Sequence, residues 1–216
     1  MGFVGDDGEF TGFDLEMAAE VAKRLNLMIA YQPIAWDAKD MELDAGTIDC
    51  IWNGFTMNGR EDDYEWSKPY MKNNQVFVVR GDSDINSEAD LAGKNVEVQT
   101  DSSAEAALND NSELTSTFGS LTPVADYNTA FMDLESGAVD AIAMDDVVAS
   151  YQITSRKADF KVLDDVIAAE EYGIGFKKGN TGLRDKVQAT LEEMAADGTA
   201  AKISEKWFGK DITTIQ

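Results

Sequence analysis

The chain has 216 residues, of which 41 are acidic and 18 basic, giving a formal net charge of −23, and it contains no histidine. The negative charge argues against binding to nucleic acids or anionic membranes, because their phosphate groups would be repelled. The absence of histidine excludes Ser-His-Asp and Cys-His catalysis and histidine-based metal sites, so no metal or cofactor is expected. The hydrophobic content of 44% indicates a globular fold. The single cysteine, Cys50, is expected to be a buried structural thiol.

The first half of the chain alternates between helical and strand patterns. Apolar residues at helical spacing predict a helix over 14–26, with Asp14 as its N-cap. The elements expected after it are a strand over 28–34, a short helix over 38–45 ended by Gly46, a buried strand over 48–52 and a strand over 75–79.

The second half continues the alternation. Strands are expected over 95–99, 139–143 and 172–176, and helices over 103–108, 128–136, 146–155, 181–197 and 199–207. This order of elements predicts an α/β protein with mainly parallel sheets.

One phrase occurs twice. LDAGTIDCI (43–51) and LESGAVDAI (134–142) share leucine, an acid, a small residue, glycine, a β-branched residue, aspartate and isoleucine in register. Each copy is interpreted as a helix closed by a glycine, followed by a short buried strand with polar residues at its C-terminal end. Ligands of open α/β sheets bind outside such strand ends, which favours two similar lobes that each present one strand end. Coincidence between two generic helix–strand units is the alternative.

Six segments in this order carry a resemblance that covers nearly the whole chain: GEFTGFDLEMAAEVAKRL, IDCIWNGFTMNGREDDYEWSKPY, DLAGKNVEVQTDSSAE, VDAIAMDD, EYGIGFKKGN and DGTAAKISEKWFG. The chain resembles the substrate-binding proteins of polar amino acid ABC transporters, solute-binding protein family 3. This family includes the glutamine-, histidine- and lysine/arginine/ornithine-binding proteins. The resemblance implies a type II periplasmic-binding-protein fold, in which two α/β lobes joined by two crossover strands close on one amino acid.

The resemblance also implies the domain boundaries. Lobe 1 is expected to comprise residues 1–79 and 174–216, and lobe 2 residues 80–173. The crossover strands are expected at 76–80 and 170–174.

The resemblance implies that the two copies of the phrase supply opposite poles of the ligand site. Arg60 matches the carboxylate-binding arginine, and Gly54 and Thr56 match positions that contact the ligand through backbone and hydroxyl. The interval from Thr56 to Arg60 is one residue shorter than in the common form of the motif. Without the motif, Arg60 would be interpreted as a surface ion pair. From the second lobe, Asp145 matches the ammonium-binding aspartate.

Further ligand contacts are expected from both lobes. Ser102 and Ser103 fall where a second carboxylate contact lies, at a helix N-terminus whose N–H groups and dipole favour an anion. An ordinary N-cap is the alternative, and both roles can coexist. Trp36 resembles the aromatic residue that packs on the ligand side chain, although a core tryptophan is also consistent. The other expected side-chain contacts are Gln99, Met144 and Asn53. None is charged, so a neutral polar ligand such as glutamine is predicted.

Two other functions fit the same fold. Some proteins of this fold are cyclohexadienyl or arogenate dehydratases, but no nucleophile–base pair is evident, so the chain is not predicted to be an enzyme. A ligand-sensing domain of a receptor would share the site. The predicted partners are a free amino acid and the membrane permease of an ABC importer.

The N-terminal region departs from the family pattern. A strand expected before Met1 and a signal peptide are absent from this sequence, so an extracytoplasmic location, in the periplasm or lipid-anchored at the cell surface, rests on the resemblance alone. The expected consequence is a strand-exchanged dimer, a first lobe of low stability, or a segment such as 211–216 folding back into the first sheet.

Overall fold

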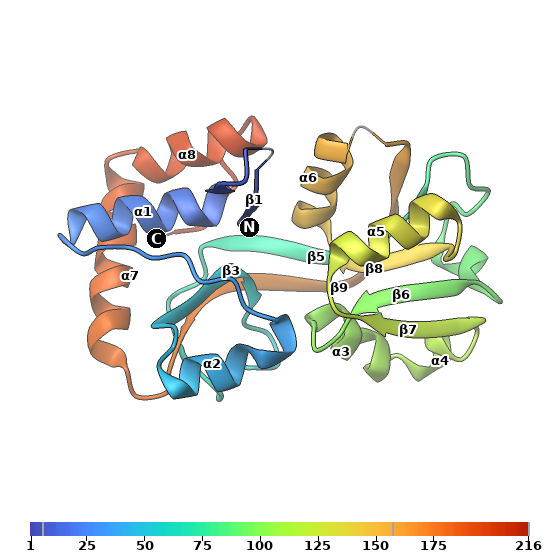
Figure 1. The fold of residues 1–216 in the computed structure, drawn as a ribbon, viewed down its shortest axis with the longest axis horizontal. Coiled ribbons are helices and arrows are strands. Elements are labelled where there is room, and N and C mark those ends of the chain that lie inside the picture. Colours follow the sequence, from blue (N-terminus) through green and yellow to red (C-terminus); the bar gives the residue numbers. More distant parts are fainter. Residues whose placement is uncertain (6, 157, 216) are drawn as a thin grey trace. The chain divides into compact units, whose positions relative to one another are not determined.

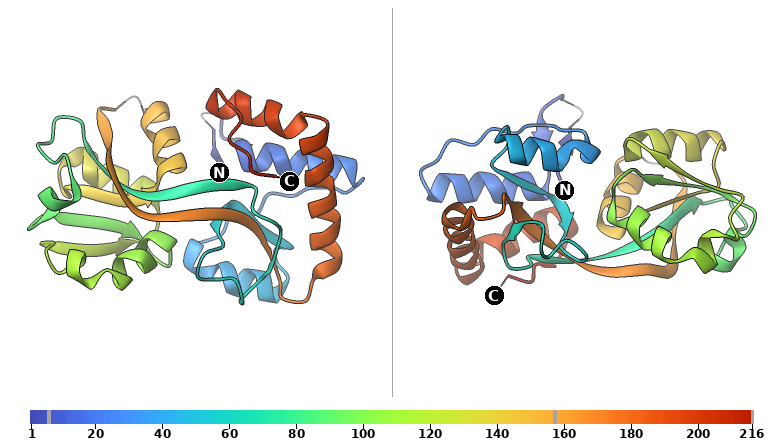
Figure 2. Two further views of the ribbon diagram at one scale, coloured as in Figure 1. Left: turned by 180° about the vertical axis from the view of Figure 1, so that it is seen from behind. Right: turned by 90° about the horizontal axis from the view of Figure 1, so that it is seen from below.

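The computed structural model describes residues 1–5, 7–156 and 158–215 (Figure 1). The chain divides into two compact units. Unit 1 contains Met1–Ile34, Ala38–Lys72 and Glu170–Gln216, and unit 2 contains Ala35–Asp37 and Asn73–Ala169. The chain passes between units within β5 (Met71–Arg80) and β9 (Phe160–Phe176), which are neighbours in one sheet and run side by side in Figure 2. Two divisions therefore fall at 72/73 and 169/170, where the sequence predicted 79/80 and 173/174. The sequence did not predict the assignment of the short segment Ala35–Asp37 to unit 2.

Unit 1 begins with a short two-stranded sheet, followed by helix α1 (Phe13–Arg24). The buried face of α1 includes Phe13, Met17 and Val21. Its N-cap is Gly12, so the prediction of Asp14 as N-cap was wrong. Asp14 lies in the first helical turn and is fully buried. Its carboxylate does not cap the helix but accepts hydrogen bonds from the Gly54 N–H and the Tyr70 hydroxyl.

The prediction of a strand over 28–34 was also wrong. The described residues there form no strand, and Met28 is fully exposed. The apolar pattern was present, but a strand requires a neighbour to complete its hydrogen bonds, and no described strand pairs with this segment. The C-terminal segment expected to fold back does contact the start of β5, through a bridge between Thr213 and Met71. Residue 216 lies outside the described residues.

The remaining elements of unit 1 follow the expected order with shifted bounds. The short helix and the strand after it are α2 and β3, and the two C-terminal helices are α7 and α8. The bounds are β1 (Phe3–Val4), β2 (Phe10–Thr11), α2 (Lys39–Ala45), β3 (Cys50–Thr56), β4 (Glu65–Trp66), α7 (Thr181–Ala196) and α8 (Thr199–Phe208). A 3-10 helix, η1 (Trp36–Ala38), precedes α2, and its first two residues belong to unit 2.

Unit 2 contains a three-layer arrangement. Strands β6 (Asn95–Gln99) and β7 (Ser120–Val124) pair in parallel, as do β6 and β8 (Ala141–Asp145), whereas β5 pairs with β8 antiparallel. Strands β3 and β4 of unit 1 also pair antiparallel with β9. The sheet is therefore mixed, and the prediction of mainly parallel pairing was wrong.

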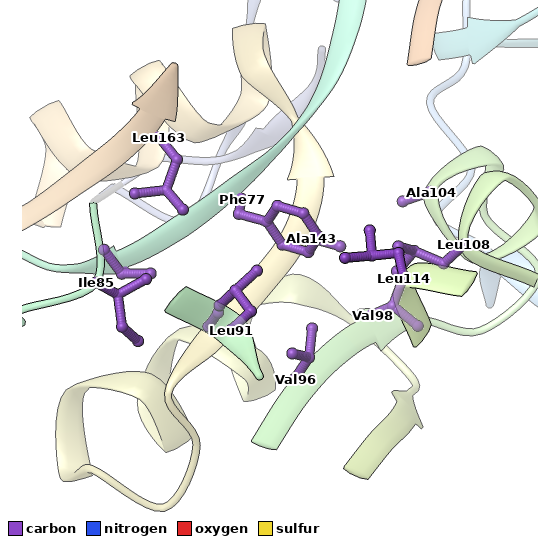
Figure 3. Close-up of a cluster of buried hydrophobic side chains, with 12 residues drawn as sticks. Phe77, Ile85, Leu91, Val96, Val98, Ala104, Leu108, Leu114, Ala143 and Leu163 are labelled. Atoms are coloured by element: carbon purple, nitrogen blue, oxygen red, sulfur yellow. The ribbon is translucent and has the colours of Figure 1, made fainter. Parts of the chain in front are cut away.

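Helices cover both faces of the unit 2 strands (Figure 1). One face packs on α3 and α4 through a core cluster that includes Phe77, Val98 and Leu108 (Figure 3). The other face packs on α5 and α6 through a second cluster around Ile142 and Phe131. The helical bounds are η2 (Glu88–Leu91), α3 (Ser103–Asp110), α4 (Ser112–Thr115), α5 (Tyr127–Ser136) and α6 (Asp146–Arg156).

The repeated phrase forms the same local structure in both units. Helices α2 and α5 end at Gly46 and Gly137, whose φ angles are 74° and 79°. In each copy the glycine N–H donates to a carbonyl three residues earlier and the next N–H to one five residues earlier, the paired bonds of a Schellman motif. Strands β3 and β8 follow. The helix, the glycine and the strand are confirmed for both copies, but only β8 is buried throughout, whereas β3 is buried in part.

Candidate functional site

The polar cluster of unit 2 is centred on Asp145, the last residue of β8. Its side chain is 9% exposed. Oδ1 accepts two hydrogen bonds from β5, one from Nδ2 of Asn73 at 2.8 Å and one from Nε2 of Gln75 at 2.9 Å. Both donors are buried, and Gln75 is directly opposite Asp145 in the β5–β8 ladder. The pairing of β5 with β8 thus fixes one predicted ligand residue in place.

Gln75 also connects Asp145 with the N-terminus of α3. Its Nε2 lies 3.4 Å from the hydroxyl oxygen of Ser103, the first residue of that helix. Ser102 is the N-cap, and its hydroxyl accepts a hydrogen bond from the N–H of Glu105 at 3.1 Å. The structure therefore brings Asp145 and Ser103 together through Gln75, and it shows Ser102 as the N-cap, a role that can coexist with the predicted ligand contact.

The polar cluster of unit 1 lies at the C-terminal end of β3. Arg60 follows the strand in a turn, and its Nη1 donates to the Thr56 carbonyl at 3.3 Å. The guanidinium carbon lies 5.5 Å from the centre of the Phe55 ring, within the range of a cation–π contact. The indole of Trp66 donates to the Arg60 carbonyl at 2.9 Å. Backbone and side chain of Arg60 are thus both held beside Thr56.

Gly54 occupies a left-handed backbone conformation within β3, with φ of 56°. The register of β3 against β9 shifts between Ile51 and Phe55, so this glycine lies in the irregular part of the strand. Its N–H donates to Oδ2 of Asp14 at 2.8 Å, and is therefore already engaged within unit 1. The hydroxyl of Tyr70 donates to the other oxygen of Asp14 at 2.9 Å.

Four further predicted residues have individual placements. The amide oxygen of Asn53 accepts from the N–H of Gly2 at 2.7 Å, and Nε2 of Gln99 donates to the Ala125 carbonyl at 3.2 Å. Met144 is fully buried and belongs to the core cluster that packs on α5 and α6, on the face of β8 opposite to Asp145. Its expected contact with the ligand side chain stays a prediction. Trp36 is partly buried at the start of η1.

The sequence prediction missed Asn73 and Gln75 of β5 and Glu170 of β9. Asn73 and Gln75 lie on one face of β5, on either side of Asn74. The next residues on that face are the buried apolar Phe77 and Val79. Buried amides at a spacing of two in an otherwise apolar strand were the signal that could have found them. Glu170 had no such signal, because it stands beside a second glutamate in the sequence.

Cys50, at the start of β3, is only partly buried, whereas the sequence predicted a buried thiol. Burial still raises the pKa of the thiol to about 12, with a smaller contribution from Asp49, which makes it a poor nucleophile at neutral pH. No group of three or more histidine, cysteine or acidic side chains suited to a metal ion occurs among the described residues. None of the described helices is long and apolar enough to cross a membrane.

Residues 1–210 match the family described as bacterial extracellular solute-binding proteins, family 3. The L-cystine-binding protein TcyJ of Escherichia coli (strain K12) is 33% identical over 98% of this chain and 79% of its own length. The L-cystine-binding protein TcyA of Bacillus subtilis (strain 168) is 32% identical over 96% of this chain and 76% of its own length.

Solved structures agree with this assignment. The substrate-binding protein of an ABC uptake transporter from Streptococcus pneumoniae, solved with bound histidine, has a TM-score of 0.95 and 34% identity. The match covers 99% of this chain and 89% of the Streptococcus pneumoniae protein. An ancestral arginine-binding protein bound to glutamine has a TM-score of 0.89 and 34% identity, over 97% of this chain and 92% of that one. The fold is thus that of the type II periplasmic binding proteins, and the chain belongs to family 3 of the bacterial extracellular solute-binding proteins.

Proposed function

We propose that this protein binds a free polar L-amino acid and delivers it to the permease of an ABC importer on the extracytoplasmic side of the membrane. The observation that carries the proposal is the pair of clusters with opposite charge: Arg60 beside Thr56 in unit 1, and Asp145 with its amide donors in unit 2. A free amino acid presents one carboxylate and one ammonium group, each of which costs several kcal/mol to desolvate unless it is paired.

In the proposed complex, Arg60 binds the ligand carboxylate. A guanidinium offers parallel N–H donors that match the two carboxylate oxygens, so the contact is strong and oriented. The cation–π contact with Phe55 and the bond to the Thr56 carbonyl hold the guanidinium in place. Ser103 at the start of α3 supplies a second contact, where backbone N–H groups and the helix dipole favour an anion.

Asp145 binds the ligand ammonium in this proposal. Asn73 and Gln75 fix its orientation by donating to Oδ1. The hydroxyl oxygen of Thr56 accepts another ammonium hydrogen. The Gly54 N–H already donates to Asp14, so the carbonyl is the backbone group of Gly54 that we assign to the ammonium.

The side chain of the ligand is assigned from the predicted contacts around it. L-glutamine stays the first choice from the uncharged predicted contacts, with Trp36 packing against the ligand. The relatives broaden the candidates, because they include proteins named for cystine, arginine and histidine.

Calorimetric titration with the twenty standard amino acids and L-cystine tests the proposal. We expect saturable binding of one molecule per chain, without conversion of the ligand. Failure of every amino acid to bind would overturn the proposed function. Turnover of prephenate or arogenate would show that the chain is an enzyme.

A further inference from the structure

Glu170 is a buried carboxylate next to a predicted ligand residue. It lies in β9 on the unit 1 side of the division, and only 6% of it is exposed. Its Oε2 accepts a hydrogen bond from the hydroxyl of Thr56 at 2.8 Å. An acidic side chain is rarely buried to this extent unless it is paired, so the contact calls for an explanation beyond packing.

The β3–β9 ladder fixes this contact. Thr56 lies opposite Tyr172, and the N–H of Met57 donates to the carbonyl of Glu171 at 2.9 Å. Successive side chains of a strand point to opposite faces. Accordingly Glu170 is buried, whereas the neighbouring Glu171 is exposed. Only one of two adjacent glutamates is therefore placed to act on Thr56.

The contact with Glu170 determines whether the Thr56 hydroxyl can donate or accept a hydrogen bond toward a ligand. A threonine hydroxyl has one hydrogen and two acceptor lone pairs, and an ionised carboxylate has no hydrogen to donate. When Thr56 donates its hydrogen to Glu170, its oxygen can only accept from a ligand. Thr56 then favours an ammonium group over a carboxylate, and the negative charge of Glu170 adds to this preference.

We propose that Glu170 is a positioning residue that turns the Thr56 hydroxyl into an acceptor for the ligand ammonium. The inference rests on the proposed function, because it assumes that an amino acid binds at Thr56. It identifies the α-ammonium as the part of the ligand that Glu170 selects, acting through Thr56.

A set of single and double variants tests this inference. Affinities are measured by calorimetry for whichever of L-glutamine, L-histidine, L-arginine and L-cystine the wild type binds most tightly. The variants are Glu170→Gln, Thr56→Val and the double variant, and Glu171→Gln is the matched control. Circular dichroism and thermal unfolding establish that each variant is folded.

We expect Glu170→Gln to weaken binding at least about tenfold, and Glu171→Gln to leave it unchanged. In the Thr56→Val background, Glu170→Gln should weaken binding clearly less than it does in the wild type, because the hydroxyl through which Glu170 acts is gone and only its charge is left to lose. As a second measurement, Glu170→Gln should not change the affinity for the ligand without its amino group, such as imidazolepropionate in place of L-histidine.

The outcomes separate this inference from the proposed function. The positioning role is wrong, while the proposed function stands, if the wild type binds an amino acid and Glu170→Gln binds it with an affinity within threefold of the wild type. The same conclusion follows if the losses of affinity caused by Glu170→Gln and Thr56→Val multiply in the double variant. An equal loss of affinity for the deaminated ligand would also overturn the positioning role. If the wild type binds none of the four ligands or the other amino acids, both proposals fail.

Discussion

The carboxylate of Asp14 joins helix α1 to strand β3, because its Oδ2 accepts the N–H of Gly54 at 2.8 Å. Its other oxygen accepts the hydroxyl of Tyr70 at 2.9 Å, and the amino group of Met1 contacts Oδ2 as well. Asp14 is fully buried. A buried acceptor shared by several donors fixes their relative positions, since any displacement leaves a polar group without a partner. Asp14 thereby determines the path of β3 just before Thr56.

Replacement of Asp14 by alanine should destabilise unit 1. The Gly54 N–H and the Tyr70 hydroxyl would lose a buried acceptor, and each unsatisfied group costs about 1–3 kcal/mol. We expect a loss of roughly 2–4 kcal/mol in the free energy of unfolding, measured by urea denaturation. The exposed Asp62 provides the control, and Asp62→Ala should change stability by less than about 0.5 kcal/mol. A similar small change for Asp14→Ala would contradict the role assigned to its carboxylate.

Replacement of Arg60 by alanine should abolish high-affinity amino acid binding and leave the fold intact. The guanidinium is proposed to pair with the ligand carboxylate, and a charge-assisted double hydrogen bond is stronger than an exposed ion pair. Calorimetry should show at least a tenfold loss of affinity, equivalent to about 1.4 kcal/mol. Arg60→Lys should recover only part of it, because an ammonium group keeps the charge but not the planar pair of donors. Unchanged affinity in Arg60→Ala would remove Arg60 from the site.

Asp145→Asn should weaken binding to a similar degree. The substitution is nearly isosteric, but it removes the negative charge that is proposed to pair with the ligand ammonium. The adjacent Asp146 offers a matched control, since its Oδ2 accepts from Nδ2 of Asn74 at 3.0 Å in the same manner as Asp145 accepts from Asn73. Asp146→Asn should bind the amino acid within about threefold of the wild type. Equal losses in the two variants would show that the effect is one of overall charge, and that Asp145 has no specific contact.

Unit 2 should become less stable as the pH rises above the ordinary range of a glutamate. Glu97 is 6% exposed on β6, and burial, with a smaller contribution from Asp133, raises the pKa of its carboxyl group. Because the folded state holds the proton more tightly, the stability from neutral Glu97 is fully present below the unfolded pKa of about 4.3 and is lost as the pH passes the raised folded value. Glu97→Gln should therefore raise the melting temperature at pH 7.

The pH dependence distinguishes this effect from simple repacking. The difference in melting temperature between Glu97→Gln and the wild type should shrink as the pH is lowered toward about 4. Glu135→Gln, which removes an exposed carboxylate from α5, should show no such trend. A difference that stays constant from acid to neutral pH would mean that ionisation of Glu97 does not limit the stability of unit 2.

The sequence alone predicted most of the helices in their order and the strand-end placement of the two charged residues, but it missed β1, β2, β4, β7 and α4. The repeated phrase showed this directly: a glycine at C′ and a run of apolar residues are local signals, and both copies formed the same helix end and strand. The family motif assigned Arg60 and Asp145 to those strand ends. These inferences succeed because helix termination and burial periodicity depend on residues that are close in the sequence.

The tertiary structure decided which polar groups form hydrogen bonds with one another. The bonds of Asp14 to Gly54, of Gln75 to Asp145 and of Glu170 to Thr56 join residues 40, 70 and 114 positions apart. No local pattern specifies such partners, because they depend on strand pairing and register. The same reason explains the strand that did not form over 28–34, where the apolar pattern was correct but no described strand supplied the neighbouring ladder. Strand formation and side-chain pairing are properties of neighbours in space.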